Sequence, residues 1–304
     1  MPSINMQNAA QVIELFERAT RATLEAACRQ DSLEVIHAPG RLIATGDLHD
    51  NPAHFEKLIQ IAHLDHPHDQ PGNDHADEAP IHITFHEVIH SDKLLNGMDF
   101  SYRAIARIAQ LKCCAPERVH MLLANHELAQ IVGAGIVKDG VRCVEAFNDG
   151  LAYVFGDAWE RVARALGHYI RALPIGLRCI TPKGDLMCLH SLPATGAMAR
   201  FDASILSREL TEDDFQPRVG SVHLLVWGRG YDAEQIEDLV ERWGVNLFIL
   251  GHEHAQNGYL YIEPAVVVLN SDHERGVYMD IDLDDPPTLG QVPGLIRSLR
   301  GIAQ

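Results

Sequence analysis

The stretch Leu42-Ile43-Ala44-Thr45-Gly46-Asp47-Leu48-His49-Asp50 joins a strand-like run to a polar cluster. Its first four residues are apolar or β-branched, as in a buried strand, and Gly46 lets the backbone bend sharply where that strand ends. Asp47 and His49 lie two residues apart, so both side chains can face one cation. The stretch therefore predicts a strand whose end carries metal-ligating groups.

Four further polar clusters follow apolar, strand-like runs in the same way. They are His86-Glu87-Val88-Ile89-His90, Asn125-His126-Glu127, His190-Ser191 and Gly251-His252-Glu253-His254. Their carboxylate, imidazole and amide groups bind hard or borderline divalent cations. An α/β protein builds its site at the edge where strand ends converge, so these clusters together predict a two-metal hydrolase.

Periodicity along the chain predicts strands that alternate with helices in the first half. Helices are expected over 7–29, 52–62, 101–115, 141–171 and 233–243, and strands over 42–45, 81–85, 119–123, 186–189, 222–227 and 245–250. Residues 259–281 read as further β-structure. This order favours an α/β protein with a mixed sheet covered by helices.

Domain boundaries follow from the same pattern. We expect an N-terminal helix (1–30) packed on the core, a main domain (31–283) and a C-terminal tail (284–304). Within the main domain, 141–175 reads as a helical, cap-like insertion. Segment 63–80 is rich in His, Asp, Pro and Gly and is predicted to be an exposed loop, and nothing in the sequence fixes its histidines (His63, His66, His68 and His75) as a further metal site.

Bulk composition narrows the class of protein. The 304 residues are 46% apolar and 22% charged, as in soluble globular proteins. A formal charge of −17 argues against a general nucleic-acid surface, because a phosphate backbone would be repelled. The six cysteines lack the spacing of a secreted scaffold, and we find no signal-peptide pattern and no membrane-spanning run. We therefore expect reduced thiols, no membrane partner and a cytoplasmic location.

The order of the clusters resembles the calcineurin-like metallophosphoesterases. Gly-Asp-x-His, an acidic cluster, Asn-His-Glu, a lone histidine after a strand and Gly-His-x-His follow one another between residues 41 and 281. The residues leading into Asn125, and the Trp227-Gly228-Arg229 segment, resemble the phosphoprotein phosphatase branch. The resemblance implies an α/β/β/α sandwich of mixed sheets flanked by helices, and a metal-dependent phosphoric ester hydrolase acting on a phosphorylated small molecule or phosphoprotein.

The resemblance also implies a role for each matching residue. Asp47, His49 and His254 match ligands of a first metal, Glu87 falls where an aspartate bridges both metals, Asn125, His190 and His252 match ligands of a second metal, and His126 matches the histidine that protonates the leaving oxygen. Two adjacent cations can share a hydroxide and hold a phosphoryl group for in-line attack, while an imidazole supplies a proton. Nitrogen and oxygen ligands without thiolate favour two divalent ions from manganese, iron or zinc.

The second motif departs from the family pattern, Gly-Asp-x-x-Asp-Arg/Asn. Glu87 adds a methylene to the bridging group, His90 replaces an aspartate that supports the catalytic histidine, and Ser91 replaces an arginine that grips the phosphate. His90 is therefore a second catalytic candidate. Arg229 becomes the candidate phosphate clamp, because a planar guanidinium fits phosphate oxygens, although a surface loop arginine is an equally plain interpretation.

Three other functions compete with a phosphomonoesterase. His86-Glu87-x-x-His90 spells the zinc-peptidase pattern, which needs a helix, but the preceding residues alternate as a strand and Val88-Ile89 disfavours a helix. A dinucleotide polyphosphate hydrolase would use the same metal ligands. A metal-binding interaction module without turnover is compatible with the altered second motif. Glu127 is either a partner of a ligand or a helix-start charge.

Overall fold

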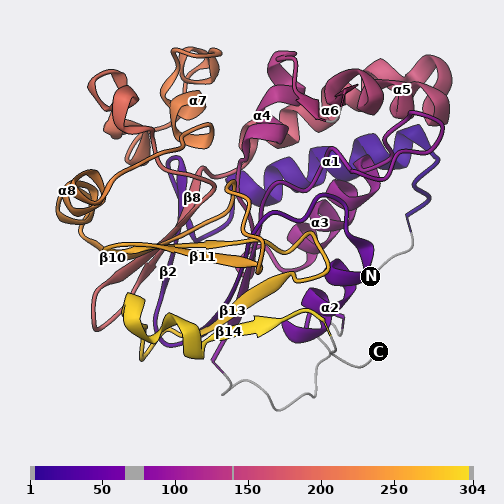
Figure 1. Ribbon diagram of the computed structural model, residues 1–304. Coiled ribbons are helices and arrows are strands. Elements are labelled where there is room, and N and C mark those ends of the chain that lie inside the picture. The colour runs from indigo at the N-terminus through magenta and orange to yellow at the C-terminus, as the bar shows by residue number, and fades with distance from the viewer. Residues whose placement is uncertain (1–3, 66–78, 139, 301–304) are drawn as a thin grey trace.

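The computed structural model describes residues 4–65, 79–138 and 140–300 (Figure 1). Most of the predicted exposed loop, 63–80, including His66, His68 and His75, lies outside the described residues. No helix in the described part of the chain is long and apolar enough to cross a bilayer, and the compartment stays a prediction.

Two mixed sheets form the centre of the molecule. The larger has the strand order β1 (Arg29–Gln30), β2 (Leu33–His37), β8 (Gly176–Ile180), β9 (Asp185–Leu189), β10 (Val245–Leu250), β12 (Val266–Leu269) and β11 (Tyr259–Ile262). The smaller has the order β14 (Ile296–Ser298), β13 (Val277–Asp282), β3 (Arg41–Thr45), β4 (Ile81–Phe85) and β5 (Val119–Met121). A separate hairpin pairs β6 (Val137–Lys138) with β7 (Val141–Arg142).

Alternation along the strands explains why the sheets stack. In β3, Leu42 and Ala44 belong to one apolar cluster, whereas Ile43 between them belongs to another. The first cluster also contains Leu247 and Ile249 of β10, so it is the core between the two sheets. Successive side chains of a strand point to opposite faces, and each sheet is therefore covered on both sides.

Helices cover the outer faces of the sandwich (Figure 1). They are α1 (Ala9–Leu24), α2 (Pro52–Ile61), α3 (Tyr102–Cys114), α4 (Asn125–Val132), α5 (Cys143–Phe155), α6 (Trp159–Ala172), α7 (Ser221–Val226) and α8 (Ala233–Trp243). α1 packs on α3 and α6, α3 contacts β5 of the smaller sheet, and α8 contacts β10 of the larger one. The predicted α/β/β/α sandwich of mixed sheets flanked by helices is confirmed.

The sequence predictions were wrong or incomplete at several places. The helix expected over 7–29 ends at Leu24, and Arg29 already belongs to β1. Residues 222–226 of the strand expected over 222–227 belong to α7, because a short apolar run is compatible with either structure. Strands β2 and β8 were not predicted, and β14, in the expected tail, pairs with β13. α5 and α6 confirm the helices expected over 141–171, but they pack with α1 and α4, and their role as a cap stays a prediction.

Strand ends from both sheets meet at the point where the polar clusters lie. Asp47, directly after β3, forms parallel β-bridges with His86 after β4 and with Asn270 after β12. The backbone N–H of Gly251, after β10, donates to the carbonyl of His190, after β9, at 3.1 Å. The topology therefore gathers residues that lie far apart in the sequence at one edge of the sandwich.

Candidate metal centre

Glu87 lies in the middle of the gathered side chains. Its Oε1 is 2.8 Å from Nε2 of His49 and 3.5 Å from Nε2 of His126. Its Oε2 is 2.8 Å from Nε2 of His190. All four residues are largely buried. The two oxygens of one carboxylate thus face two different histidines, as a bridging ligand requires.

Two sets of ligand atoms share this carboxylate. His49, Glu87 and His126 form one set, and Glu87, His190 and His252 form the other, with the ligand atoms of each set within 4.8 Å of one another. Asn125 joins the second set, because its Oδ1 lies 2.6 Å from Nε2 of His190. The structure therefore brings together five of the predicted metal ligands and the predicted catalytic His126.

An unpartnered polar atom shows that a cation fits this site. Nε2 of His252 is buried and has no hydrogen-bond partner among the described residues. Burying such an atom without a partner costs free energy, which a bound cation would offset. The donor set of imidazole, carboxylate and amide oxygen suits manganese, iron or zinc.

Asp47 is held against the second set by a tight backbone contact. Both carboxylate oxygens lie 2.9 Å from the backbone N–H of His252, which donates to them. A Cβ at Gly251 would lie 2.2 Å from Oδ1 of Asp47, so only glycine allows this approach. Asp47, His86 and His190 form a third set of close ligand atoms.

His86 received no role in the predicted two-metal centre, although the peptidase pattern contains it. Its Nε2 lies 2.7 Å from the carbonyl oxygen of Thr45, to which it donates, and its Nδ1 lies 3.2 Å from Nδ1 of His190. The ring of His190 is thereby oriented by a second imidazole. The available signal was a histidine where the related motif has glycine.

Strained backbone marks four of these positions. His49, Glu87, His90 and His252 have φ angles of 41°, 47°, 62° and 69°, in the left-handed region that non-glycine residues rarely adopt. Such conformations persist only where the surrounding structure enforces them, and they concentrate at functional sites.

Glu127 enforces the conformation of the turn that carries Glu87. Its Oε1 accepts the backbone N–H groups of Val88 (2.8 Å) and Ile89 (3.2 Å). The side chain is fully buried, and burial raises its pKa to about 7. Glu127 also lies in the first turn of α4, which begins at Asn125 and has Ala124 at its N-cap. Both interpretations offered by the sequence therefore hold.

The electrostatics of the site favour the metal-binding forms of Glu87, His126 and His252, but not that of His49. Burial opposes ionisation of Glu87, but His126, His49 and His190 hold its pKa well below the usual range. Burial lowers the pKa of His126 to about 3 and that of His252 to about 2, so both imidazoles are neutral, which is the form that binds a metal. Burial alone would lower the pKa of His49, but Glu87 raises it to about 9.

The two histidines predicted to be catalytic are in contact. Nδ1 of His90 lies 3.0 Å from Nδ1 of His126. Residues 86–90 form no helix, and His86 and His90 turn to different partners, His190 and His126. The helical geometry that a zinc peptidase would need is therefore not there.

Two other predicted residues lie at the margin of the site. The guanidinium of Arg229 lies 3.4 Å from Nδ1 of His252 and 2.9 Å from a carboxylate oxygen of Glu253. His254 is exposed, its ring centroid lies 6.0 Å from that of His273, and the structure does not bring it into any set of ligand atoms.

A second group of ligand-type side chains, Cys28, Glu34 and His120, lies elsewhere in the core. Oε1 of Glu34 already accepts from Nζ of Lys112 at 2.6 Å, and His120 bonds its other oxygen. Lys112 therefore neutralises the carboxylate of Glu34, and this group does not fit a further cation.

Comparison with known proteins agrees with this geometry. The family model for calcineurin-like phosphoesterases matches residues 40–256. A protein serine/threonine phosphatase from Saccharomyces cerevisiae superposes with a TM-score of 0.66 at 13% identity, covering 98% of this chain and 91% of that chain. A cold-active protein-tyrosine phosphatase from a psychrophilic Shewanella species gives a TM-score of 0.57 at 12% identity, covering 89% and 83%. At these identities the superpositions show a shared fold. A search of curated proteins gave no significant match.

Proposed function

This chain belongs to the calcineurin-like phosphoesterase family and is a phosphoric ester hydrolase, and from that premise we propose that it hydrolyses phosphomonoesters at a dinuclear metal centre. The observation that carries the proposal is the carboxylate of Glu87, whose two oxygens each lie 2.8 Å from a different histidine, His49 and His190. One shared carboxylate between two sets of ligands is what a pair of adjacent cations needs.

The proposed ligands divide between the two ions. As the family resemblance implies, Asp47 and His49 would hold the first, Asn125, His190 and His252 the second, and Glu87 both. Among the close sets of ligand atoms, Asp47 lies with His86 and His190 and not with His49. Bound divalent ions from manganese, iron or zinc would neutralise phosphate charge and make water more acidic. A role for His254 as an extra ligand stays a prediction.

The chain's own side chains supply the remaining chemistry. His126 faces the centre with Nε2, which lies 3.5 Å from Glu87, so once protonated at Nε2 it is placed to give that proton to the leaving oxygen. Arg229 borders the second set, and its side chain is 52% exposed, which leaves the guanidinium open to a substrate phosphate. Serine and threonine phosphates in proteins are one class of ester that this centre would accept.

Hydrolysis of p-nitrophenyl phosphate by the purified protein with added manganese tests the proposal. We expect turnover in the wild type and two ions per chain by metal analysis. Asn125→Ala and His252→Ala should each lower kcat/KM by about 100-fold or more, because each removes a ligand of the second ion. His168→Ala, which removes an exposed histidine of α6, should act like the wild type.

Each outcome has a clear meaning. Two bound ions without turnover of this or any other phosphate ester would contradict hydrolysis and favour a metal-binding interaction module. Full activity in Asn125→Ala and His252→Ala would contradict the ligand assignment.

A further inference from the structure

Four polar side chains, of which His126 is the first, form a hydrogen-bonded row on the side of His126 that faces away from Glu87. Nδ1 of His126 lies 3.0 Å from Nδ1 of His90, and Nε2 of His90 lies 3.0 Å from Oε1 of Gln130. Nε2 of Gln130 donates to Oδ1 of Asn148 at 2.9 Å. The row starts on α4, crosses the turn after β4, returns to α4 and ends on α5.

The direction of these hydrogen bonds follows from the amide at the far end. A neutral imidazole has one donor and one acceptor nitrogen. Because the N–H of Gln130 is engaged by Asn148, its carbonyl oxygen faces His90, and Nε2 of His90 must donate to it. Nδ1 of His90 then accepts from Nδ1–H of His126. The lone pair of His126 is left on Nε2, the nitrogen that faces the metal centre, so Nε2 takes up a proton from water before it can give one to the leaving oxygen.

Because a histidine replaces the aspartate of the family motif, the residue at position 90 does not by itself determine the direction of its hydrogen bond to His126. The resemblance places a carboxylate at the position of His90, and a carboxylate can only accept, so it fixes the tautomer of its partner by itself. A histidine can donate or accept at either nitrogen. In this chain, something beyond His90 must decide between the two directions.

We propose that Gln130 and Asn148 are positioning residues that fix the tautomer and ring orientation of His126 through His90. The proposal rests on the function proposed above, because it concerns the group that protonates the leaving oxygen. It adds two residues, Gln130 on α4 and Asn148 on α5, that do not touch the metal ligands.

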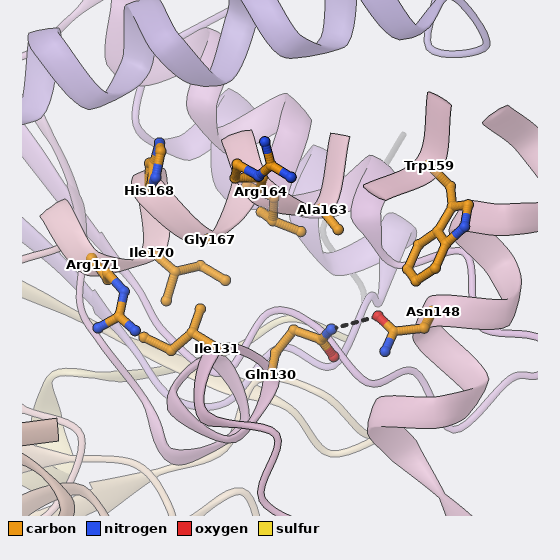
Figure 2. A pocket seen from close by; sticks show the side chains of 11 residues that line it. Gln130, Ile131, Asn148, Trp159, Ala163, Arg164, Gly167, His168, Ile170 and Arg171 are labelled. Carbon is orange, nitrogen blue, oxygen red and sulfur yellow. Dashed lines mark hydrogen bonds between the residues drawn. The ribbon is translucent and has the colours of Figure 1, made fainter. Parts of the chain in front are cut away.

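Gln130 and Asn148 lie where they can be substituted without disturbing the core. Gln130 and Asn148 line a cavity of about 360 Å³ between α4, α5 and α6. Figure 2 shows their hydrogen bond, with Ile131 beside Gln130 and Trp159 near Asn148. Both side chains are partly exposed, whereas His90 is buried and packs on Phe147, with ring centroids 5.8 Å apart. Changes at the pair therefore alter the hydrogen bonds without opening the core.

Two variants separate hydrogen-bond direction from packing. Asn148→Asp places an acceptor-only group opposite Gln130 and so preserves the direction inferred here. Gln130→Met keeps the side-chain length but removes the acceptor for His90. Nitrogen-15 NMR of the metal-free protein reports the tautomer of His126 without any turnover. We expect Nδ1–H in the wild type and Asn148→Asp, and a mixture of tautomers in Gln130→Met.

Kinetics of the manganese-loaded protein give the second measurement. With phosphoserine, whose leaving alkoxide needs a proton, Gln130→Met should lower kcat by about 10-fold with little change in KM, a part of what general acid catalysis contributes. With p-nitrophenyl phosphate, whose leaving group departs as a stable anion, kcat should change less. Gln235→Met is the matched control, since Gln235 is a buried glutamine that bonds Pro193 and Thr195 instead.

A change of tautomer in Asn148→Asp, or a Gln130→Met variant that matches the wild type in both measurements, would overturn the proposal. A wild type that shows Nδ1–H on His126 but hydrolyses no ester would support the hydrogen-bond direction and contradict the proposed function. The two failures are thus distinguishable.

Discussion

Glu127 illustrates how one buried side chain controls a strained turn. It lies outside every set of ligand atoms, yet its Oε1 holds the N–H groups of Val88 and Ile89 directly after Glu87. Glu87 has φ of 47°, so the turn depends on such external bonds to stay in place. The position of the carboxylate that we propose to bridge the two ions is therefore set from α4.

Substitution at Glu127 should separate its hydrogen bonds from its charge. Glu127→Gln retains an acceptor oxygen and should keep kcat within a few-fold of the wild type. Glu127→Ala leaves two buried N–H groups unpaired and should destabilise the fold by about 2–4 kcal/mol. Urea unfolding and metal content measure both effects. Equal behaviour of the two variants would contradict the role of the acceptor.

The same residue predicts a pH dependence in metal-free protein. The folded protein keeps the Glu127 proton up to a pH of about 7, whereas the unfolded chain loses it near the ordinary value of 4.5. Between these values the unfolded state binds fewer protons, so this group makes stability fall as pH rises. Glu127→Gln should therefore gain free energy of unfolding relative to the wild type as pH increases from 4.5 to 7. A constant difference across that range would disprove this.

At the scale of single residues, the sequence indicated which side chains gather at the site better than which side chains support them. Asp47, His49, Asn125 and His252 carry their chemistry in the side chain and follow recognisable strand ends. The role of His86 depends on its contacts with Thr45 and His190, which lie 41 and 104 positions away in the chain. Only the fold creates such contacts, so a motif could not reveal them.

At the scale of elements, the turn after β3 depends on close packing against the other sheet. A Cβ at Gly46 would lie 1.8 Å from the carbonyl oxygen of Leu269, which ends β12. This oxygen belongs to the backbone and cannot move aside as a flexible side chain would. The glycine thus serves close approach between the sheets, rather than only the bend that the sequence predicted.

Gly46→Ala should therefore displace the loop that carries Asp47 and His49. We expect a loss of at least about 2 kcal/mol in the free energy of unfolding, as for overpacked cores, together with weaker metal binding. Gly196→Ala is the control, because nothing lies within 4 Å of the added Cβ in that 3-10 helix (Thr195–Arg200). Urea titration and metal analysis compare the two, and equal stability would refute the packing argument.

Elements differed in how well the sequence predicted them. α8 and β10 were predicted with their observed bounds, because α8 has a clear helical period and a cap at Asp232, and β10 is an apolar run before Gly251 that only Asn246 interrupts. α7 was mistaken for a strand because a six-residue, mostly apolar segment is too short to show a helical period. Ser101, the first residue of the helix expected over 101–115, lies at the N-cap of α3, and its hydroxyl bonds Asp99 rather than a backbone N–H of the helix.

At the scale of the whole molecule, a buried polar network joins the two sheets away from the metal centre. Glu34 on β2 of the larger sheet bonds Lys112 on α3 and His120 on β5 of the smaller sheet. Nζ of Lys112 also donates to the carbonyl oxygens of Pro116 (2.7 Å) and Val119 (3.0 Å). The side chains of Glu34 and Lys112 are almost completely buried. Each neutralises the charge of the other, because an unpaired charge in the core would be strongly destabilising.

Lys112→Met should therefore cost about 3–5 kcal/mol of stability, because it leaves the carboxylate of Glu34 buried without its cation. Adding Glu34→Gln removes that charge and should restore at least about 1 kcal/mol, which a purely local packing defect at Lys112 would not allow. Lys183→Met breaks an exposed pair with Asp285 and should cost less than about 1 kcal/mol. Urea unfolding of these variants measures the differences in stability. If Lys112→Met costs as little as Lys183→Met, the apolar core alone holds the two sheets together and the pair of Glu34 and Lys112 does not contribute.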